Sequence, residues 1–453
     1  MPGRSGSLRP GITGDFPQKR RKQCGQRSNF ARTRGDCQVQ GAATRTIVPY
    51  ENEIANSTIM WNTEPTMKKR IYWQNRIENA WEMSSVLWLS GVRKTGKTLL
   101  SKSIGDIEYF DCELPRTRRL LSDHESFLTK LKGKRVVLDE IHRIKDPSAV
   151  LREAALKHPG VKILATGPST LTASPGFRKE LTGRMEEIWL TPVMSAGLTD
   201  FGNTSVEHRL QAGGLPPFFL NEQTSEREYQ EWLDSYWAKD VQDEFKLAKR
   251  WSFQQFLELL FENSGKVFEA TRYAGPCDIS RPTVASYLQV MENTFVAHVI
   301  RPFHTGRPAE ILSAPRVYAF DTGFVCYFRG LQDLACDNLA NLWEHFILNE
   351  IQSRMQTRDV LYWRDKHGYQ VDFVLVDRGG AAPTAVQCSW AAEDVDIRSL
   401  KYFRRQYPGG ENWVIARDVT KPFEITEKGM VFRFMGLQDL ASVLEERNLA
   451  LTA

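Results

Sequence analysis

Residues 91–98 constrain this chain more than any other segment, because they fit the pattern G-x-x-x-x-G-K-[ST] of a phosphate-binding P-loop. The glycines let the backbone turn sharply, so that consecutive N–H groups point at phosphate oxygens. Lys97 can then reach the β- and γ-phosphates, and the Thr98 hydroxyl can hold Mg²⁺. We therefore expect nucleotide to be bound by Gly91, Val92, Arg93, Lys94, Thr95, Gly96, Lys97 and Thr98.

The surroundings of this loop support the interpretation. Residues 86–89 before it form an apolar run that predicts a buried strand, and residues 99–104 after it predict the start of a helix. A strand, a loop and a helix N-terminus in that order are what a phosphate site requires.

A second apolar run, residues 135–140, ends in two carboxylates. A P-loop protein needs a carboxylate on a neighbouring strand to hold the water shell of Mg²⁺, and Asp139 suits that role. Hydrolysis also needs a group that orients or deprotonates the attacking water, and Glu140 suits that one. The alternative is a surface Asp-Glu pair that follows a core strand.

Two further candidates come from later strand ends. Thr166 closes an apolar run and could sense the γ-phosphate or position water, or else cap the loop at 167–170. Arg184 could act as an arginine finger, in the same chain or from a neighbouring subunit, or it could be an ordinary surface arginine. With Lys97 and Glu140, these residues complete the predicted catalytic set.

Between residues 67 and 192, apolar strands alternate with helical stretches, which predicts an α/β core with a parallel sheet and helices on both faces. The ligand of such a sheet binds at the carboxyl ends of its strands, where Gly91 and Asp139 fall. Residues 193–250 predict a helical linker, and the part at 228–241 predicts a partly exposed helix with no chemistry of its own.

Residues 251–325 predict three helices followed by a strand hairpin, the order of a winged-helix module. Val284, Tyr287, Leu288 and Met291 recur at helical spacing and predict the core face of the third helix. Its opposite face is weakly basic, so a packing or protein contact is favoured over DNA binding. Residues 339–445 predict a small α/β domain, in which Glu344 lies on a helix and Asp372 on a strand.

Composition narrows the class of protein. The chain has 453 residues, of which 41% are hydrophobic and 25% charged, a balance typical of a soluble protein with several domains. No apolar run approaches the ~18 residues of a membrane span. Seven cysteines without a C-x-x-C pair favour a reducing, cytoplasmic setting.

The basic charge is concentrated at the N-terminus. Residues 1–46 hold ten Lys and Arg but two acids, so this segment carries +8 and the rest of the chain −3, against a total of +5. We expect residues 1–60 to be a disordered tail that folding and nucleotide binding do not need. Its Lys19–Lys22 run would otherwise be a targeting or nucleic-acid patch, and Met60 and Met67 are candidate translation starts.

Taken in order, these parts resemble a family of prokaryotic AAA-type ATP-binding proteins that join a P-loop ATPase to a winged helix and a C-terminal domain related to PD-(D/E)XK nucleases. The residues that carry the resemblance are 91–98, 138–140, 165–167, 181–184, 213–216, 321–323, 362–364 and 371–373. The resemblance implies ATP as the nucleotide, with hydrolysis. A homo-oligomer and a protein or DNA partner at the winged helix stay open, and no membrane contact is expected.

The C-terminal part departs from that pattern. Nuclease-like domains of this type follow an acid such as Asp372 with a strand that carries E-x-K, whereas this chain has Gln387 and Ser389 at those positions. Mg²⁺ favours anionic oxygen, so Glu344 and Asp372 alone would hold it poorly. We expect an ATPase without nuclease activity, with a nucleotide-gated switch or an ATP-dependent DNA-processing protein as the alternatives.

Overall fold

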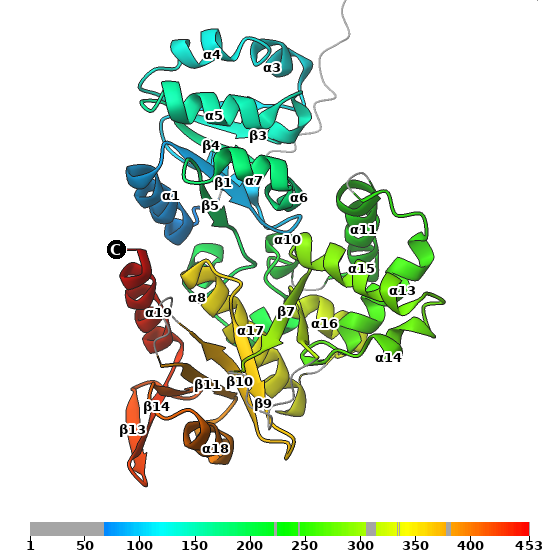
Figure 1. Ribbon diagram of the computed structural model, residues 1–453, viewed down its shortest axis with the longest axis vertical. Helices are drawn as coiled ribbons and strands as arrows, with labels where there is room; N and C mark the ends of the chain where they lie inside the picture. Colours follow the sequence, from blue (N-terminus) through cyan, green and yellow to red (C-terminus); the bar gives the residue numbers. More distant parts are fainter. Residues whose placement is uncertain are drawn as a thin grey trace, which may run out of the picture. The chain divides into compact units, whose positions relative to one another are not determined.

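The computed structural model describes residues 68–452, except residues 222–223, 243–244, 305–313, 333, 335 and 377–381. The predicted N-terminal tail and both candidate starts, Met60 and Met67, lie outside the described residues. So does most of the loop between the two strands of the predicted hairpin. Figure 1 draws the described part in colour.

Five parallel strands form the first sheet, in the order β2-β3-β4-β1-β5. Each forms at a predicted apolar run, so the α/β core with a parallel sheet is confirmed (Figure 1). The strands are β1 (Val86–Ser90), β2 (Ile107–Asp111), β3 (Arg135–Asp139), β4 (Lys162–Thr166) and β5 (Glu186–Trp189).

Helices cover both faces of this sheet. Val86, Trp88 and Val136 share a core with α4, α5 and α7, whereas Leu87 and Val137 share another with α1 and α2. Burial on both faces explains why the central strands, β1, β3 and β4, are mostly apolar. The elements are α1 (Ile71–Met83), α2 (Lys97–Lys102), α3 (Pro115–Leu120), α4 (His124–Lys130), η1 (Ile141–Arg143), α5 (Pro147–Lys157), α6 (Ser169–Ala173) and α7 (Pro175–Leu181).

A helical segment follows β5, as predicted. Ser225 and Glu228 form a reciprocal capping box at the start of its longest helix, α11. That helix continues directly into a π-helix, η3. The elements are α8 (Ser195–Leu198), η2 (Thr199–Phe201), α9 (Val206–Ala212), α10 (Pro216–Phe219), α11 (Glu226–Tyr236) and η3 (Trp237–Gln242).

The glycine pair at 213–214 packs directly against the start of α16 (Thr322–Arg329). The Gly214 N–H donates to Asp321 Oδ2 at 2.6 Å, and a Cβ on Gly213 would lie 2.0 Å from Asp321 Oδ1. Buried Arg209 donates to Thr322 Oγ1 at 2.9 Å. The sequence motifs at 213–216 and 321–323 are therefore two halves of one contact.

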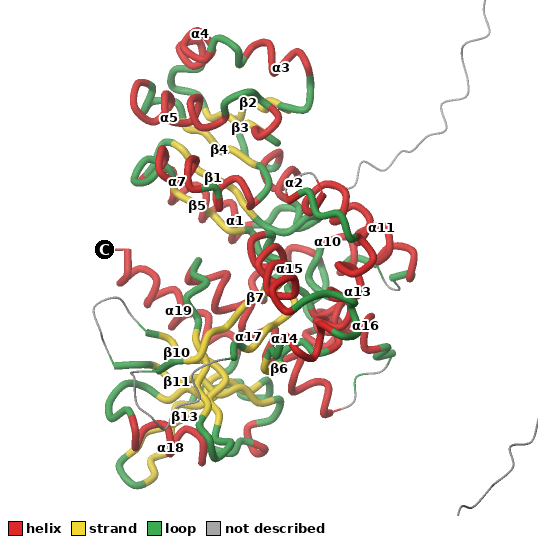
Figure 2. The backbone as a smooth tube through the Cα atoms, turned by 45° about the vertical axis from the view of Figure 1, so that its right-hand side comes forward, coloured by secondary structure: helices red, strands yellow, loops and turns green. Residues whose placement is uncertain are grey.

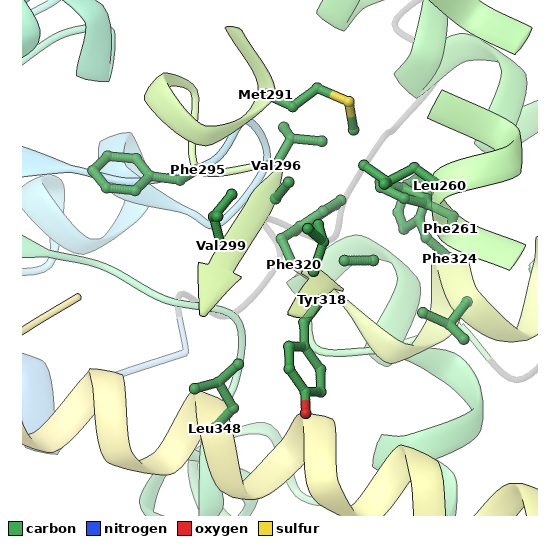
Figure 3. Packing of buried hydrophobic residues seen from close by; sticks show 14 of the residues in the cluster. Leu260, Phe261, Met291, Phe295, Val296, Val299, Tyr318, Phe320, Phe324 and Leu348 are labelled. Atoms are coloured by element: carbon green, nitrogen blue, oxygen red, sulfur yellow. The ribbon is translucent and has the colours of Figure 1, made fainter. Parts of the chain in front are cut away.

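Three helices and three short antiparallel strands follow, with β6 between the first two helices, whereas the sequence predicted three helices followed by a two-strand hairpin. All four predicted core residues of α15 are buried, and Ser280 caps its N-terminus. Figure 3 shows side chains from these elements, among them Leu260, Met291 and Phe320, gathered in one cluster. The elements are α13 (Arg250–Glu262), β6 (Lys266–Val267), α14 (Ala270–Ala274), α15 (Arg281–Asn293), β7 (Ala297–Pro302) and β8 (Arg316–Ala319).

These strands belong to a larger sheet, which runs across the domain boundary predicted at 325–339. Its order is β13-β14-β12-β11-β10-β9-β7-β8-β6. The junction is a parallel pairing of β7 with β9, at Arg301 with Leu361 and Pro302 with Tyr362. The C-terminal strands are β9 (Leu361–Arg364), β10 (Gln370–Leu375), β11 (Thr384–Ser389), β12 (Asn412–Ala416), β13 (Phe423–Glu427) and β14 (Met430–Met435).

The C-terminal helices lie on opposite faces of this sheet (Figures 1 and 2). Trp343 of α17 and Leu440 of α19 share a core with Phe373 of β10, whereas Leu400 of α18 packs with Val371. The elements are α17 (Cys336–Met355), η4 (Ala392–Asp394), α18 (Arg398–Gln406) and α19 (Leu437–Thr452).

Candidate functional site

The loop between β1 and α2 takes its shape from two glycines. Gly91 has φ +142°, and a Cβ there would lie 2.3 Å from the Leu190 carbonyl oxygen. Gly96 has φ +93° and immediately precedes α2. The amine of Lys97, the first residue of α2, donates to the carbonyl oxygens of Gly91 at 2.8 Å and Val92 at 3.3 Å.

The middle of the loop is fixed from outside the first sheet. Arg70, just before α1, donates to the Thr95 carbonyl oxygen at 2.8 Å. The buried Thr95 hydroxyl donates to Val92 O at 2.7 Å and so stabilises the loop from within. Lys94 has φ +66° and an exposed side chain. Of the eight predicted nucleotide-binding residues, Val92 and Thr95 support the loop, whereas the other six line the cavity described below.

Three hydroxyl groups converge on the carboxylate of Asp139. Thr98 Oγ1 donates to Asp139 Oδ2 at 2.9 Å, and the Tyr109 hydroxyl donates to the same oxygen. The Thr166 hydroxyl donates to the other oxygen, Oδ1. The P-loop, β2 and β4 therefore all contact the end of β3.

Thr166 also joins the two acids. It is fully buried, and its hydroxyl accepts a hydrogen bond of 3.0 Å from the Glu140 N–H. The cavity wall beside it is formed by Gly167, Pro168 and Ser169 and not by Thr166. The structure therefore gives Thr166 a place behind the acidic pair, which differs from both predicted positions, at the phosphate or in the loop.

Glu140 adopts a left-handed backbone conformation, with φ +53°, which is uncommon for a residue with a side chain. Its Oε2 lies 3.2 Å from His142 Nδ1. Burial alone would raise the pKa of Glu140, but His142 and the cations Lys97 and Arg93 lower it below the ordinary value. The carboxylate is thus held in its ionised form, which a group that accepts a proton from water requires.

The pKa of the Lys97 amine is lowered as well, which for an amine disfavours the charged form. Desolvation lowers its pKa below the ordinary value, while the carboxylates of Glu140 and Asp240 act against that shift. Asp240 lies on η3, in the helical segment. That segment therefore contributes a negative charge that acts on the P-loop lysine.

A cavity of about 280 Å³ lies at the carboxyl ends of the strands. One wall comes from the P-loop and from the segments after β3 and β4. The second wall comes from η3 and its neighbours and comprises Tyr236, Lys239, Asp240, Thr294 and Val296. No role was predicted for residues 228–241, yet Tyr236 at the end of α11 and Lys239 and Asp240 on η3 line this cavity. The apolar face of α11 dominates the sequence pattern and does not indicate them.

The second wall is joined to the first by direct contacts. Arg93 Nε lies 2.6 Å from Asp240 Oδ2, and both side chains are largely sheltered from solvent. The Ser169 hydroxyl donates to the Asn293 carbonyl oxygen at 2.9 Å. The P-loop and the segment after β4 therefore each contact an element beyond the first sheet.

Arg184 lies at the opposite edge of the first sheet. It precedes β5, donates to the Glu180 carbonyl oxygen at 3.0 Å, and lines a surface hollow with Ser85 and Leu156. An arginine-finger role within the same chain is thus contradicted, because the amino ends of parallel strands face away from the P-loop. A role from a neighbouring subunit stays a prediction.

The oxygen atoms near the loop fit a magnesium ion. Thr98 Oγ1 and Asp139 Oδ2 are 2.9 Å apart beside the first turn of α2. The described residues contain no cluster of three or more Asp, Glu, His or Cys side chains that could hold a metal. This suits Mg²⁺, which usually takes one or two protein oxygens and completes its shell with phosphate and water.

A guanidinium group lies between the two C-terminal carboxylates. Arg316 Nη1, from β8, is 2.6 Å from Glu344 Oε1 and 3.6 Å from Asp372 Oδ1. Asp372 Oδ2 accepts hydrogen bonds from Gln387 Nε2 at 2.6 Å and from the Cys388 N–H at 2.9 Å. All of the charged groups are buried. The position that a divalent cation would take between these acids thus adjoins an arginine.

Some residues of both clusters were not predicted. Tyr109, His142, Asp240 and Arg316 each contact one of the predicted acids or the P-loop. His142 stands two residues after Glu140, so sequence proximity alone could have found it. Asp240 is 147 positions from Arg93, and Arg316 lies on a different element from Glu344 and Asp372, so no local pattern indicates either residue.

Three family models match successive parts of the chain. Residues 83–197 match an AAA domain, residues 203–335 match a domain of unknown function, DUF8612, and residues 339–435 match another, DUF4143. With the parallel sheet and its P-loop, the first match defines an AAA-type P-loop protein.

The relatives extend this similarity over most of the chain. Two uncharacterised proteins, from Mycobacterium bovis and Mycobacterium tuberculosis, are each 27% identical over 315 residues, which cover 66% of this chain and 69% of theirs.

Solved structures show weaker similarity. A Walker-type ATPase of Pyrococcus abyssi is 14% identical, with a TM-score of 0.39, over 58% of this chain and 96% of that one. The DnaA protein of Aquifex aeolicus, bound to AMPPCP, is 13% identical, with a TM-score of 0.23, over 48% of this chain and 86% of that one. Within the described residues, no helix has the length and apolar character needed to cross a membrane.

Proposed function

We propose that this protein is a Mg²⁺-dependent ATPase that communicates its nucleotide state to its C-terminal elements. The observation that carries the proposal is the chain of contacts from Thr98 through Asp139 and Thr166 to Glu140, which ends at the P-loop cavity. ATP, among the nucleotides, is inferred from the match to an AAA domain.

Each residue of the site has a distinct task in this proposal. The Lys97 amine exchanges its bonds to the loop carbonyls for phosphate oxygens, and Thr98 and Asp139 hold Mg²⁺. When bound, Mg²⁺ supplies positive charge that balances the phosphates. Glu140 orients the attacking water and accepts its proton. Thr166 fixes the position of both acids through its two hydrogen bonds.

The link to the C-terminal elements runs through α17. Its end contacts β5 and the segment after it: Ser195 Oγ donates to Glu350 Oε2 at 2.9 Å, and the N–H of Trp189, the last residue of β5, donates at 2.7 Å to Oε1 of Gln356, the residue that follows α17. Glu350 is almost fully buried and pairs with Arg354 at 3.1 Å. In this proposal, a movement of the first sheet is transmitted along α17 to the C-terminal elements.

The test is phosphate release from Mg-ATP, measured beside nucleotide binding for the wild type, Lys97→Ala and Glu140→Gln. We expect Lys97→Ala to lose binding, and Glu140→Gln to bind ATP but release phosphate ~100-fold more slowly. Glu125→Gln, an exposed carboxylate on α4, serves as the matched control. A wild type that binds no nucleotide would refute the proposal.

A nucleotide-gated switch is the second candidate. The observation in its favour is the ion pair between Arg93 and Asp240, which makes the cavity depend on the position of η3. A switch with little hydrolysis would bind ATP tightly, and Glu140→Gln would then change neither binding nor the slow turnover. This outcome separates the switch from the ATPase in the same experiment.

A further inference from the structure

The second wall of the cavity lies on the side where the terminal phosphate of a nucleotide would be. A P-loop places the last phosphate beyond its lysine, toward the acids that prepare the attacking water. Here those positions are marked by Lys97 and Glu140, and the same cavity continues to Pro168, Tyr236 and Lys239. Elements from outside the first sheet therefore face the reacting end of the nucleotide.

This wall is held in place by its own contacts. The Tyr236 hydroxyl and Thr294 Oγ1 are 2.7 Å apart and buried, which joins the end of α11 to the end of α15. Arg93 and Asp240 then join the wall to the P-loop. Lys239 lies on η3 between these two anchors, Tyr236 and Asp240, so its backbone is held on both sides.

Most cations that line the cavity have a carboxylate or carbonyl partner, whereas Lys239 and the exposed P-loop residue Lys94 form no ion pair within the described residues. Arg93 is paired with Asp240, and Arg143 Nε lies 3.9 Å from Glu113. Lys239 lines the cavity with an exposed side chain, and within the described residues no ion pair is formed by its amine. It also lies in a π-helix, a distortion that often occurs at functional sites.

We propose that Lys239 contacts the terminal phosphate of bound nucleotide, so that one chain supplies the full set of charges around the reacting group. This inference rests on the proposed function, since it assumes that the cavity holds a nucleoside triphosphate. It assigns to Lys239 the task that sequence analysis gave to Arg184, whose position before β5 keeps it away from the cavity.

The proposal predicts discrimination between nucleotides that differ by one phosphate. Lys239→Ala should weaken ATP binding about 10- to 100-fold, because a hydrogen bond to a charged group is lost, and should change ADP binding about 2-fold at most. Lys239→Arg should restore most of the difference. The control is Lys249→Ala, an exposed lysine further along the same segment that does not line this cavity.

The measurement is the Kd of Mg-ATP and Mg-ADP for the four proteins. An equal loss for both nucleotides, or no loss for ATP, would overturn the assignment. The ratio of the two Kd values can be measured even in a protein that binds ATP without hydrolysing it. The assignment of Lys239 can therefore be refuted independently of the ATPase proposal. A wild type that binds neither nucleotide would overturn both.

A mixing experiment tests whether the lysine acts within its own chain. Lys97→Ala retains Lys239 but has a defective P-loop, whereas Lys239→Ala has the opposite defect. Phosphate release by an equimolar mixture should equal the average of the two separate variants if each site is completed by its own chain. Recovery toward a quarter or more of wild-type release would show that the lysine acts between subunits and would overturn this part of the proposal.

Discussion

Arg316 and Glu344 form a buried ion pair, with 2.6 Å between Nη1 and Oε1, at the position where the sequence predicted two carboxylates and a poor metal site. The contact is close, although its geometry is not that of a directed hydrogen bond. Arg316 lies on β8, Glu344 on α17 and Asp372 on β10, so these three charged residues join three elements of the C-terminal part. Charge compensation here comes from the chain itself.

We expect Arg316→Met to destabilise the protein by about 3–5 kcal/mol, because it leaves a buried carboxylate without its partner. Urea unfolding of the wild type and the variant measures the effect. Arg301→Met is the control, since Arg301 is 61% exposed and pairs with Glu292 at the surface, where a pair contributes ~1 kcal/mol or less. Equal losses for the two variants would contradict the prediction.

Asp372 predicts how stability depends on pH. Burial and the neighbouring Glu344 raise the pKa of Asp372 from 3.8 to about 7, despite the opposing charge of Arg316. The folded protein therefore keeps a proton that the unfolded chain releases between pH 4 and 7, so the contribution of this group to stability falls as pH rises through that window and is flat above it. The full effect is up to ~4 kcal/mol.

The measurement compares the free energy of unfolding of the wild type and Asp372→Asn at pH 5 and pH 8. The variant cannot ionise at this position, so the wild type should lose stability relative to it as the pH is raised. A difference between the two proteins that is the same at both pH values would show that Asp372 is ionised throughout.

Gly213→Ala should be among the most damaging single changes. Gly213 has φ +88°, and its new Cβ would lie 2.0 Å from Asp321 Oδ1, so the contact between the two glycine motifs must separate. We expect a loss of ~3 kcal/mol or more. Gly133→Ala is matched to it, with φ +77° and no atom within 4 Å of the new Cβ, and should cost about 1–2 kcal/mol. Thermal unfolding distinguishes the two variants.

Thr166→Val should slow hydrolysis without preventing binding. The substitution keeps the shape of a buried side chain but removes the hydroxyl that bonds Asp139 and the Glu140 N–H. We expect phosphate release to fall ~10- to 100-fold, with ATP affinity changed little, and Thr166→Ser to retain most of the rate. A variant that loses affinity and keeps its turnover rate would instead place Thr166 at the nucleotide.

The sequence predicted the first sheet well because its central strands β1, β3 and β4 are buried on both faces and are therefore mostly apolar. It also placed the P-loop and the acidic strand, since a loop of fixed spacing and a strand end are local features. Thr166 was singled out correctly as a polar strand end, but its position behind the acids depends on the register between β3 and β4. Arg184 precedes β5, and in a parallel sheet that order alone places it at the amino ends of the strands, away from the P-loop.

The sequence by itself determined the P-loop, the acidic pair at the end of β3 and the two-sided parallel sheet, because glycine geometry, strand ends and apolar periodicity are properties of neighbouring residues. Only the tertiary structure decided that η3 faces the P-loop, that β7 joins two predicted modules in one sheet, and that Arg316 lies between two carboxylates. Arg93 and Asp240, which lie 147 positions apart, are the most distant of these pairs. These contacts depend on packing and charge in three dimensions, and packing and charge between distant residues produce no periodic pattern in the sequence.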